Sequence, residues 1–540
     1  MSRRSIKLVL GVVAAAALAV GGLFALQGDE GFTAAPGSNG PAADLGSSAP
    51  AASDRKNPNI VVISTDDQTL ESFTRETMPK THELLVDEGT TFTDSIVVTP
   101  VCCPSRATYL TGQYGHNHGI LTNNPGYPDL RRKDSVLPAW MQQAGYRTVH
   151  VGKYLNNWSE TKHPERPAPG WDDWRTELNP HGYYNYPMGI NGELVEFGEE
   201  DSDYLSTVLT DESVGAIETY VPDRRPLFLT TDYFAPHNAR GRKDPRCRAA
   251  PIPAPEDEEL FEDEALPRPK AFNERNVRDK PSFIQALPRL NKPQRRKLEK
   301  RYTCALASLR GVDRGVEAIY EALEAEGELE NTVFMFWSDN GYFNGEHRLA
   351  NKKQLHYEEG LRIPLVVRVG SEVEGARTLR SRVGRPVANI DLAPTILDYA
   401  GGDACRGSRC RAMDGLSFRG LIDDGRSQIG KRRPLLVEFE NKPRSGFTCA
   451  YEGVRVPGAF YVEHVSIPDP DTNDCRRASE REYYDLDSDP HQLNNALPPR
   501  GKVRLNREQR RLRRKLNRLR DCRGVRGRDP KPGGGRSFCG

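Results

Sequence analysis

The chain has 540 residues, of which 37% are hydrophobic and 28% are charged. Its 76 Lys and Arg residues almost balance 75 Asp and Glu residues, so the formal net charge at pH 7 is only +1. This length allows one large domain and a smaller second one. The balanced charge favours no particular class of partner, and no feature predicts a nucleic-acid partner.

The N-terminal segment predicts export. Basic residues precede an apolar run from Leu8 to Leu26, which is the layout of an export signal. The run of about 19 residues also approaches the length of a membrane span, so residues 1–26 are a signal peptide or an N-terminal membrane anchor. Residues 27–57 are predicted to be a flexible linker. The rest of the chain is therefore expected to be secreted or anchored at the outer face of the cell membrane.

Four short apolar runs are predicted to be buried strands that end in polar residues. They are NIVVISTDD (59–67), RTVHVGK (147–153), LFLTTDYFAPH (227–237) and TVFMFWSDN (332–340). Helical patterns lie between them, for example at 136–145 and 305–325. This alternation predicts an α/β fold with a mostly parallel sheet between helices. In such sheets the site lies at the carboxyl ends of the strands.

Two of these runs end in side chains that carry oxygen atoms. Asp66 and Asp67 follow one strand, and Asp339 and Asn340 follow another. Adjacent carboxylates are costly to ionise together unless a cation is present. Three carboxylates and one amide oxygen therefore predict one divalent cation, with Ca²⁺ preferred to Mg²⁺.

Basic residues are predicted beside this cation. Lys153 ends a strand, Arg106 lies one helical turn after the first of two adjacent cysteines, and Lys352 and Lys353 follow the last of the four runs. Positive charges gathered beside a metal predict an anionic substrate group. His237 also ends an apolar run and is a candidate acid for a leaving group.

The ten cysteines of an exported chain predict disulfides. Spacing alone suggests the pairs Cys405/Cys410, Cys449/Cys475, Cys522/Cys539 and Cys247/Cys304, although connectivity does not follow from sequence. Cys102 and Cys103 are left over. Because soft sulfur is a poor ligand for a hard cation, we expect that a sulfur at the site does not survive in the mature protein.

Residues 102–106 (CCPSR), followed by Thr111-Gly112, resemble the C-x-P-S-R…T-G signature of type I sulfatases. The likeness runs from Asn59 to about Asn495 and includes STDDQ, GKYLNNW, APHN, SDNG, GEHRL and YEEGLRIP. It is strongest to the branch of N-acetylglucosamine-6-sulfatases and bacterial arylsulfatase-like proteins. The resemblance implies an alkaline phosphatase-like fold and a sulfuric ester hydrolase acting on a sulfated glycan, an amino sugar or an aryl sulfate.

The resemblance also implies roles for individual residues. In that family a formylglycine-generating enzyme oxidises the first cysteine of the signature to formylglycine, whose hydrate is the nucleophile. The implied catalytic residues are Cys102, Arg106, Lys153, His237 and Lys353, with Lys352 as the alternative to Lys353. The implied cation ligands are Asp66, Asp67, Cys102, Asp339 and Asn340.

One position departs from the common family pattern. Many members carry a histidine two residues after the lysine of the G-K motif, where this chain has Leu155. In the family that histidine is thought to help expel sulfate from the modified residue. His118 and His150 are the candidates for a replacement base.

The remaining segments complete the predicted domain organisation. A catalytic domain (58–425) is followed by a C-terminal subdomain (426–499) with an antiparallel sheet and by a basic helical tail (500–540). Residues 240–300 are predicted to be a long surface excursion over the site. Residues 500–523 carry twelve Lys and Arg against two acids, which predicts either a plain surface helix or a polyanion-binding surface.

Two other functions stay open from the sequence. The first is a phosphate-ester or phosphonate hydrolase of the same superfamily, because its metal site would look similar. The second is an inactive surface protein that binds sulfated polymers through its basic tail.

Overall fold

The structure is a computed structural model. It describes residues 57–239, 247, 250–376, 380–407, 409–440, 448–469, 472, 474–499 and 504–540. The predicted signal or anchor (1–26) and all of the linker except Asn57 lie outside these residues, so both stay predictions. No helix of the described part combines the length and the apolar character that a membrane span needs.

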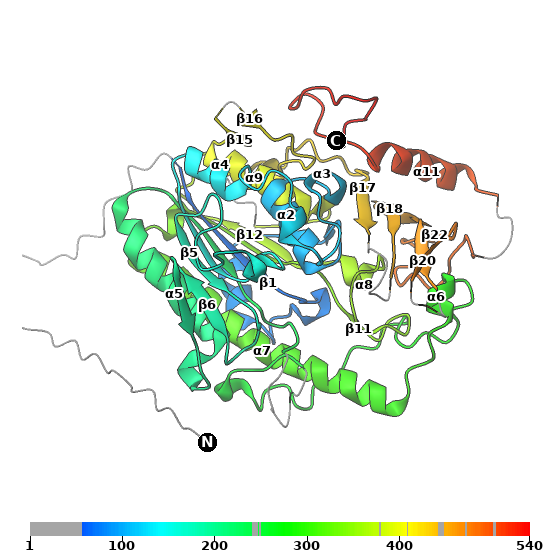
Figure 1. Cartoon of the computed structure of the whole chain (residues 1–540), viewed down its shortest axis with the longest axis horizontal. Coiled ribbons are helices and arrows are strands. Elements are labelled where there is room, and N and C mark those ends of the chain that lie inside the picture. The colour runs from blue at the N-terminus through cyan, green and yellow to red at the C-terminus, as the bar shows by residue number, and fades with distance from the viewer. Residues whose placement is uncertain are drawn as a thin grey trace, which may run out of the picture. The chain divides into compact units, whose positions relative to one another are not determined.

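The catalytic region is built on a ten-stranded sheet with the order β13-β2-β12-β9-β1-β8-β4-β5-β6-β7 (Figure 1). Its central strands β9 (Thr332–Ser338), β1 (Asn59–Thr65), β8 (Leu227–Asp232), β4 (Arg147–Gly152) and β5 (Asp173–Glu177) are parallel. The outer strands are β12 (Leu365–Val369), β2 (Thr90–Phe92), β13 (Arg382–Val383), β6 (Pro187–Ile190) and β7 (Glu193–Glu196). The prediction of a mostly parallel sheet is confirmed, and the four apolar runs supply four of its central strands.

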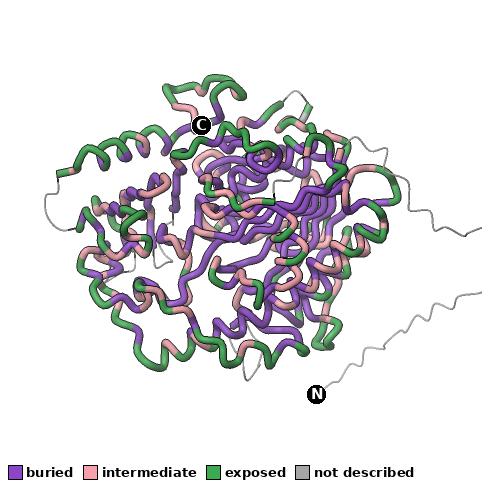
Figure 2. Tube along the Cα trace, turned by 180° about the vertical axis from the view of Figure 1, so that it is seen from behind, coloured by how far each residue is buried: buried purple, intermediate pink, exposed green. Residues whose placement is uncertain are grey.

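Alternate residues of β1 face two helix layers. Ile60 and Val62 belong to one hydrophobic cluster, and Val61 and Ile63 belong to another. The first cluster is covered by α2 (Cys102–Thr111), α4 (Leu137–Gln143) and α9 (Leu392–Ala400), and the second by α5 (Leu205–Tyr220) and α7 (Lys292–Ala325). The sheet strands are buried throughout (Figure 2), because both faces of β1 are covered.

Two predicted boundaries are wrong. The helix predicted at 305–325 begins at Lys292, because Asn291 caps it by accepting a hydrogen bond from the Gln294 amide (3.0 Å), so the surface excursion ends there. Strand β8 ends at Asp232 rather than continuing through the whole apolar run. Pro236, which lacks an amide donor, lies in the part that leaves the sheet.

A four-stranded antiparallel sheet forms the C-terminal region, as predicted. It has the order β17 (Leu435–Phe439), β18 (Tyr451–Val456), β19 (Ala459–His464) and β22 (Arg481–Asp485), and α11 (Arg507–Leu519) packs against β18 and β19. Its core residues share one cluster with residues of the catalytic region, such as Phe343 and Tyr357. The predicted domain boundaries at 425 and 499 stay predictions.

Short elements complete the fold. The helices are α1 (Pro79–Thr81), α3 (Gly115–His118), α6 (Ser282–Gln285), α8 (Glu358–Leu361) and α10 (Arg419–Asp423). The paired strands are β3 (Ser95–Ile96) with β14 (Val387–Ala388), β10 (Phe343–Asn344) with β11 (Ala350–Lys352), β15 (Cys405–Arg406) with β16 (Arg409–Cys410), and β20 (Ser466–Pro468) with β21 (Cys475–Arg477).

All four predicted disulfides are present, namely Cys247–Cys304, Cys405–Cys410, Cys449–Cys475 and Cys522–Cys539. Cys102 and Cys103 are free and buried.

Candidate active site

Two neighbouring parallel strands bring four oxygen-bearing side chains together. Strands β1 and β9 pair in register, with Thr65 opposite Ser338, so the residues that follow each strand meet at one edge of the sheet. The four side chains, at most 2% exposed, are Asp66, Asp67, Asp339 and Asn340. The amide of Asn340 donates to Asp67 Oδ1 at 2.6 Å. The carboxyl-edge rule therefore locates the predicted cation site correctly on the sheet.

The backbone of Asp67 has φ = 68°, in the left-handed region that residues with a Cβ rarely adopt. Strained residues of this kind occur at functional sites, where the surrounding structure holds them in place. At this position the turn brings a second carboxylate beside the first.

Helix α2 begins at Cys102 and points its N-terminus at these carboxylates. Val101 is the extended N-cap residue, and Gly112 ends the helix in the left-handed conformation that suits glycine. Cys102 Sγ lies 3.3 Å from Asp66 Oδ1, whereas Cys103 belongs to the hydrophobic core beside the sheet. Of the two cysteines, the structure places Cys102 at the site.

Arg106 links the cation site to strand β8. Its Nε donates to Asp339 Oδ2 at 2.9 Å, and its Nη1 donates to Asp232 Oδ1 at 3.0 Å. Burial alone would lower the pKa of Arg106, but the surrounding carboxylates raise it above its usual value. The guanidinium is therefore a fixed positive charge with one orientation.

Two lysines face the same carboxylates. Lys153 Nζ pairs with Asp66, while Lys353 Nζ lies 2.5 Å from Asp67 Oδ1 and 2.8 Å from Cys102 Sγ. Burial opposes the charge of Lys353, but the carboxylates raise its pKa well above the usual range. Lys352 ends β11 with its side chain exposed, so the structure brings Lys353 to the site and not Lys352.

His237 lies at the rim of the site. Its Nε2 is 3.8 Å from Asp67 Oδ2, and its Nδ1 lies 3.0 Å from the carbonyl oxygen of Asn238. The side chain is 30% exposed, more than any other residue that we predicted for the site. Burial lowers the pKa of His237 to about 4, although the two neighbouring aspartates oppose this shift.

The site has the electrostatics of a cation-binding pocket. Burial and then the charge of Asp66 raise the pKa of Asp339 to about 6. Burial also opposes the ionisation of Asp66, but neighbouring positive charges, Lys153 first among them, hold its pKa well below the usual range. Asn340 Oδ1 is buried without a hydrogen-bond partner among the described residues. An unpartnered amide oxygen among three carboxylates fits a hard divalent cation.

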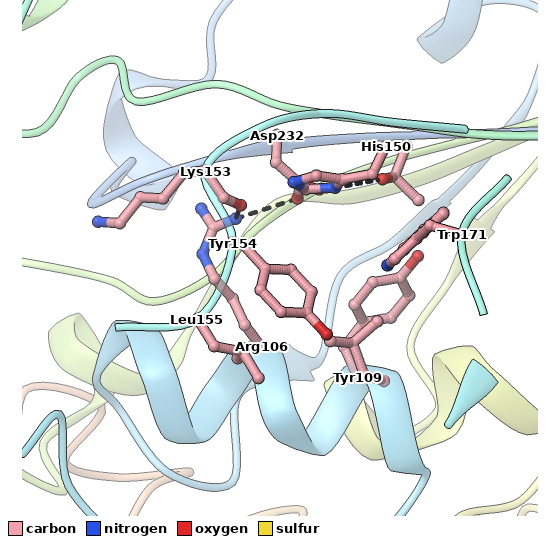
Figure 3. A pocket seen from close by; sticks show the side chains of 10 residues that line it. Arg106, Tyr109, His150, Lys153, Tyr154, Leu155, Trp171 and Asp232 are labelled. Atoms are coloured by element: carbon pink, nitrogen blue, oxygen red, sulfur yellow. Dashed lines mark hydrogen bonds and ion pairs between the residues drawn. The ribbon is translucent and has the colours of Figure 1, made fainter. Parts of the chain in front are cut away.

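Asp232 is a site residue that the sequence analysis missed. It is buried at the end of β8 and accepts hydrogen bonds from Arg106 and Ser64, and His150 Nδ1 lies 3.4 Å from its Oδ2. These groups line a cavity of about 10 Å³ together with Tyr154 and Leu155 (Figure 3). The signal was present, because Asp232 is an acid at a strand end, but the apolar run around it concealed that end.

The two candidate replacement bases have different surroundings. His118 Nε2 lies 3.1 Å from Thr108 Oγ1 in the interior. His150 lies in the same cavity as Leu155, with Nδ1 3.0 Å from Thr230 Oγ1. Only His150 connects to the site, through Asp232 and Arg106.

A second buried cluster lies behind Lys353. His356 Nε2 and His464 Nε2 are each 2.8 Å from Glu482 Oε1, and the Tyr357 hydroxyl donates to Oε2 at 3.1 Å. These are hydrogen-bond lengths, so protein donors satisfy the carboxylate. The cluster anchors the segment that carries Lys353 to the C-terminal sheet.

With this geometry established, comparisons with known proteins identify the family. The family model "Sulfatase" matches residues 58–402, more than half of the chain, and "N-sulphoglucosamine sulphohydrolase, C-terminal" matches residues 345–522. The chain therefore belongs to the sulfatase family, a class of sulfuric ester hydrolases.

Individual relatives agree. The chain is 35% identical to an extracellular sulfatase Sulf-1 homologue of Caenorhabditis elegans over 64% of its own length and 46% of that protein. It is 30% identical to the N-acetylglucosamine-6-sulfatase of Capra hircus over 82% of its own length and 80% of that enzyme. The chain thus spans less than half of the nematode protein but most of the goat enzyme.

A solved structure supports the fold. It is described as a complex with its substrate D-glucosamine-2-N,6-O-disulfate, and it matches with a TM-score of 0.67 at 23% identity. The match covers 86% of this chain and 97% of that one. The expected alkaline phosphatase-like fold is confirmed.

Proposed function

We propose that this protein hydrolyses sulfate monoesters of a sulfated amino sugar or glycan, with Cys102 oxidised to formylglycine and with one bound divalent cation. One observation carries the proposal: Cys102 Sγ lies between Asp66 Oδ1 (3.3 Å) and Lys353 Nζ (2.8 Å) at the edge of the sheet. The name of the goat relative and the ligand described for the similar structure support an amino-sugar substrate.

The cation would be held by Asp66, Asp67, Asp339 and Asn340 together with oxidised Cys102. Oxidation replaces the soft sulfur of Cys102 with an oxygen atom, which removes the mismatch with a hard cation. When bound, the cation offsets negative charge and favours ionisation of a hydroxyl group beside it. We propose Ca²⁺ in preference to Mg²⁺, because the ligands are carboxylate and amide oxygens on separate loops.

The modified residue supplies a geminal diol, in which one hydroxyl attacks and the other provides an internal exit. Arg106 orients this diol, because two carboxylates fix the guanidinium in a single direction. Lys153 and Lys353 offset charge on the sulfate oxygens. Their present partners are the proposed cation ligands, so both ammonium groups can turn to the substrate when the cation is held.

His237 completes the proposed machinery by protonating the leaving oxygen. Its position at the rim, more exposed than the other site residues, fits a group that meets the alcohol half of the substrate. Because Leu155 supplies no base, we propose that the Asp232–His150 pair influences the site only through its contact with Arg106.

We also propose an exported location. The N-terminal segment has the layout of an export signal, and the nematode relative is named as an extracellular sulfatase. The proposed partners are the sulfated substrate and, during maturation, a formylglycine-generating enzyme.

Mass spectrometry of the peptide that spans Cys102 tests the modification. Conversion of cysteine to formylglycine lowers the peptide mass by about 18 Da. Active protein with an unmodified peptide would contradict the proposal. Turnover of an aryl sulfate and of the matching aryl phosphate tests the reaction, and a preference for phosphate by orders of magnitude would favour the phosphohydrolase alternative.

A further inference from the structure

Helix α11 carries an exposed basic surface far from the chemistry of the site. Seven of its thirteen residues are Lys or Arg, and Glu508 is its one acid. The Tyr483 hydroxyl donates to Glu508 Oε2 at 2.7 Å. The proposed reaction uses none of these residues.

The apolar side of α11 is fully used for packing. Leu512, Leu516 and Leu519 are at most 4% exposed and belong to the core of the C-terminal sheet. The helix packs on β18 and β19 through this side, so its basic side chains lie on the opposite, exposed side (Figure 2). The orientation of the basic surface is therefore fixed by a well-packed leucine stripe.

The basic residues form a row along the helix. Arg507, Arg511, Arg514 and Arg518 are exposed and follow the i, i+4, i+7, i+11 spacing of one helix face. The row is about 16 Å long, from eleven residues at about 1.5 Å each. We call these four residues the basic stripe.

The basic stripe has no acidic partners within the described part of the chain. Arg513, on the flank, lies 3.0 Å from Glu463 Oε1, and Arg520 lies 2.9 Å from Glu452 Oε2. No such ion pair forms at the stripe itself in the segments that the structure describes. Like charges three and four residues apart repel one another, so the stripe is destabilising unless an anion neutralises it.

A neighbouring residue records this repulsion. Burial, and then the charges of Arg511, Arg518 and Arg432, lower the pKa of Lys515. Arg432 lies outside α11, just before β17, so a second element adds to the positive potential. The surface is therefore a concentrated positive field and not a set of isolated charges.

We propose that the basic stripe of α11 binds a sulfated polysaccharide chain and so holds polymeric substrate at the enzyme surface. A straight row of guanidinium groups matches a linear polymer with regularly spaced anions, and the planar guanidinium pairs well with tetrahedral oxyanions. The choice of a sulfated polymer rests on the proposed function, whereas the choice of a polyanion rests on α11 alone.

Heparin, a linear sulfated polysaccharide, is the probe. We expect the full chain with Arg511→Glu, Arg514→Glu and Arg518→Glu to bind heparin more than tenfold more weakly at low salt. The slope of log affinity against log salt should fall by about three, since three ionic contacts are lost. The matched control, Lys292→Glu, Arg296→Glu and Lys297→Glu, alters three exposed charges at the start of α7 and should change the affinity less than twofold.

Thermal unfolding checks that each variant folds, and a triple Arg→Gln variant at the same positions gives the same loss without charge reversal. Unchanged heparin affinity of both α11 variants overturns the proposal, as does an equal loss in the α7 control. Stronger competition by phosphatidylglycerol vesicles would assign the stripe to a lipid surface instead. Equal competition by hyaluronan, which carries carboxylates only, would overturn the sulfated partner.

Turnover of a small aryl sulfate by the unaltered chain is measured separately. Heparin binding without turnover contradicts the proposed hydrolase and leaves the basic stripe supported. Turnover without heparin binding has the opposite meaning.

Discussion

The active site and helix α11 use the same kind of charge in opposite ways. At the site, Arg106 is 3% exposed and its guanidinium is held by two carboxylates, whereas Arg511 and Arg514 on α11 are exposed. Buried charges interact strongly because little water screens them, and their geometry is fixed. Exposed charges act through a field that salt weakens within about 10 Å. Buried cations can therefore position a reacting group, while exposed ones can only attract.

Replacing Cys102 should give the largest effect. Cys102→Ala removes the proposed nucleophile, and we expect kcat to fall by about 10⁴-fold or more. The measurement is turnover of an aryl sulfate. Cys103→Ala is the matched control, because Cys103 lies in the core and should affect mainly stability. Equal loss in both variants would show that the site does not distinguish the two sulfurs.

Disrupting the cation site should have the next largest effect. We expect Asp339→Asn, or removal of divalent cations by a chelator, to lower kcat by about 10²- to 10³-fold, because a preorganised charge is lost. Calorimetric titration with Ca²⁺ should show one site in the native protein and much weaker binding in the variant. Full activity after exhaustive chelation would refute the cation, and recovery with Mg²⁺ alone would refute the preference for Ca²⁺.

Asp232→Asn tests whether the cavity residue positions Arg106. We expect kcat to fall by about 10- to 100-fold with little change in KM, because a displaced guanidinium misaligns the reacting group. Thr230→Val is the control, since it removes the neighbour of His150 Nδ1 without touching Arg106. Equal kcat values for Asp232→Asn and the unaltered protein would rule out a positioning role.

A smaller effect on stability is expected at the junction between the two regions. His116 Nδ1 lies 3.0 Å from Glu438 Oε2, and its Nε2 lies 2.9 Å from the carbonyl oxygen of Cys522. Burial lowers the pKa of His116, but the Glu438 carboxylate more than offsets this and raises it to about 9. The pair should therefore contribute fully below about pH 6.5 and lose its contribution as the pH rises through about 9.

Chemical unfolding at pH 6 and pH 10 measures this contribution. We expect the unaltered protein to lose about 2 kcal/mol more than His116→Asn over that range, since each unit of pKa shift corresponds to about 1.4 kcal/mol. Parallel stability profiles for the two proteins would show that the pair contributes nothing.

Much of the fold and part of the site follow from the sequence. The buried strands are visible as apolar runs, and the carboxyl-edge rule brings Asp66 and Asp339 together before any coordinates are known. Lys352 and Lys353 could not be separated, because the choice depends on where β11 ends and which way each side chain then points. Asp232 was missed because its partners, Arg106 and His150, come from distant segments whose register the sequence does not encode locally.

The burial of α2 sets the timing of maturation. Cys102 is 1% exposed, and every residue of the helix is buried between the sheet and other helices. A second enzyme cannot reach this side chain once the domain has closed, so oxidation must come before folding. Purified protein that folded with an intact thiol could not then be repaired by adding the maturation enzyme afterwards. Production of active material would require both proteins to be present while the chain is still being made.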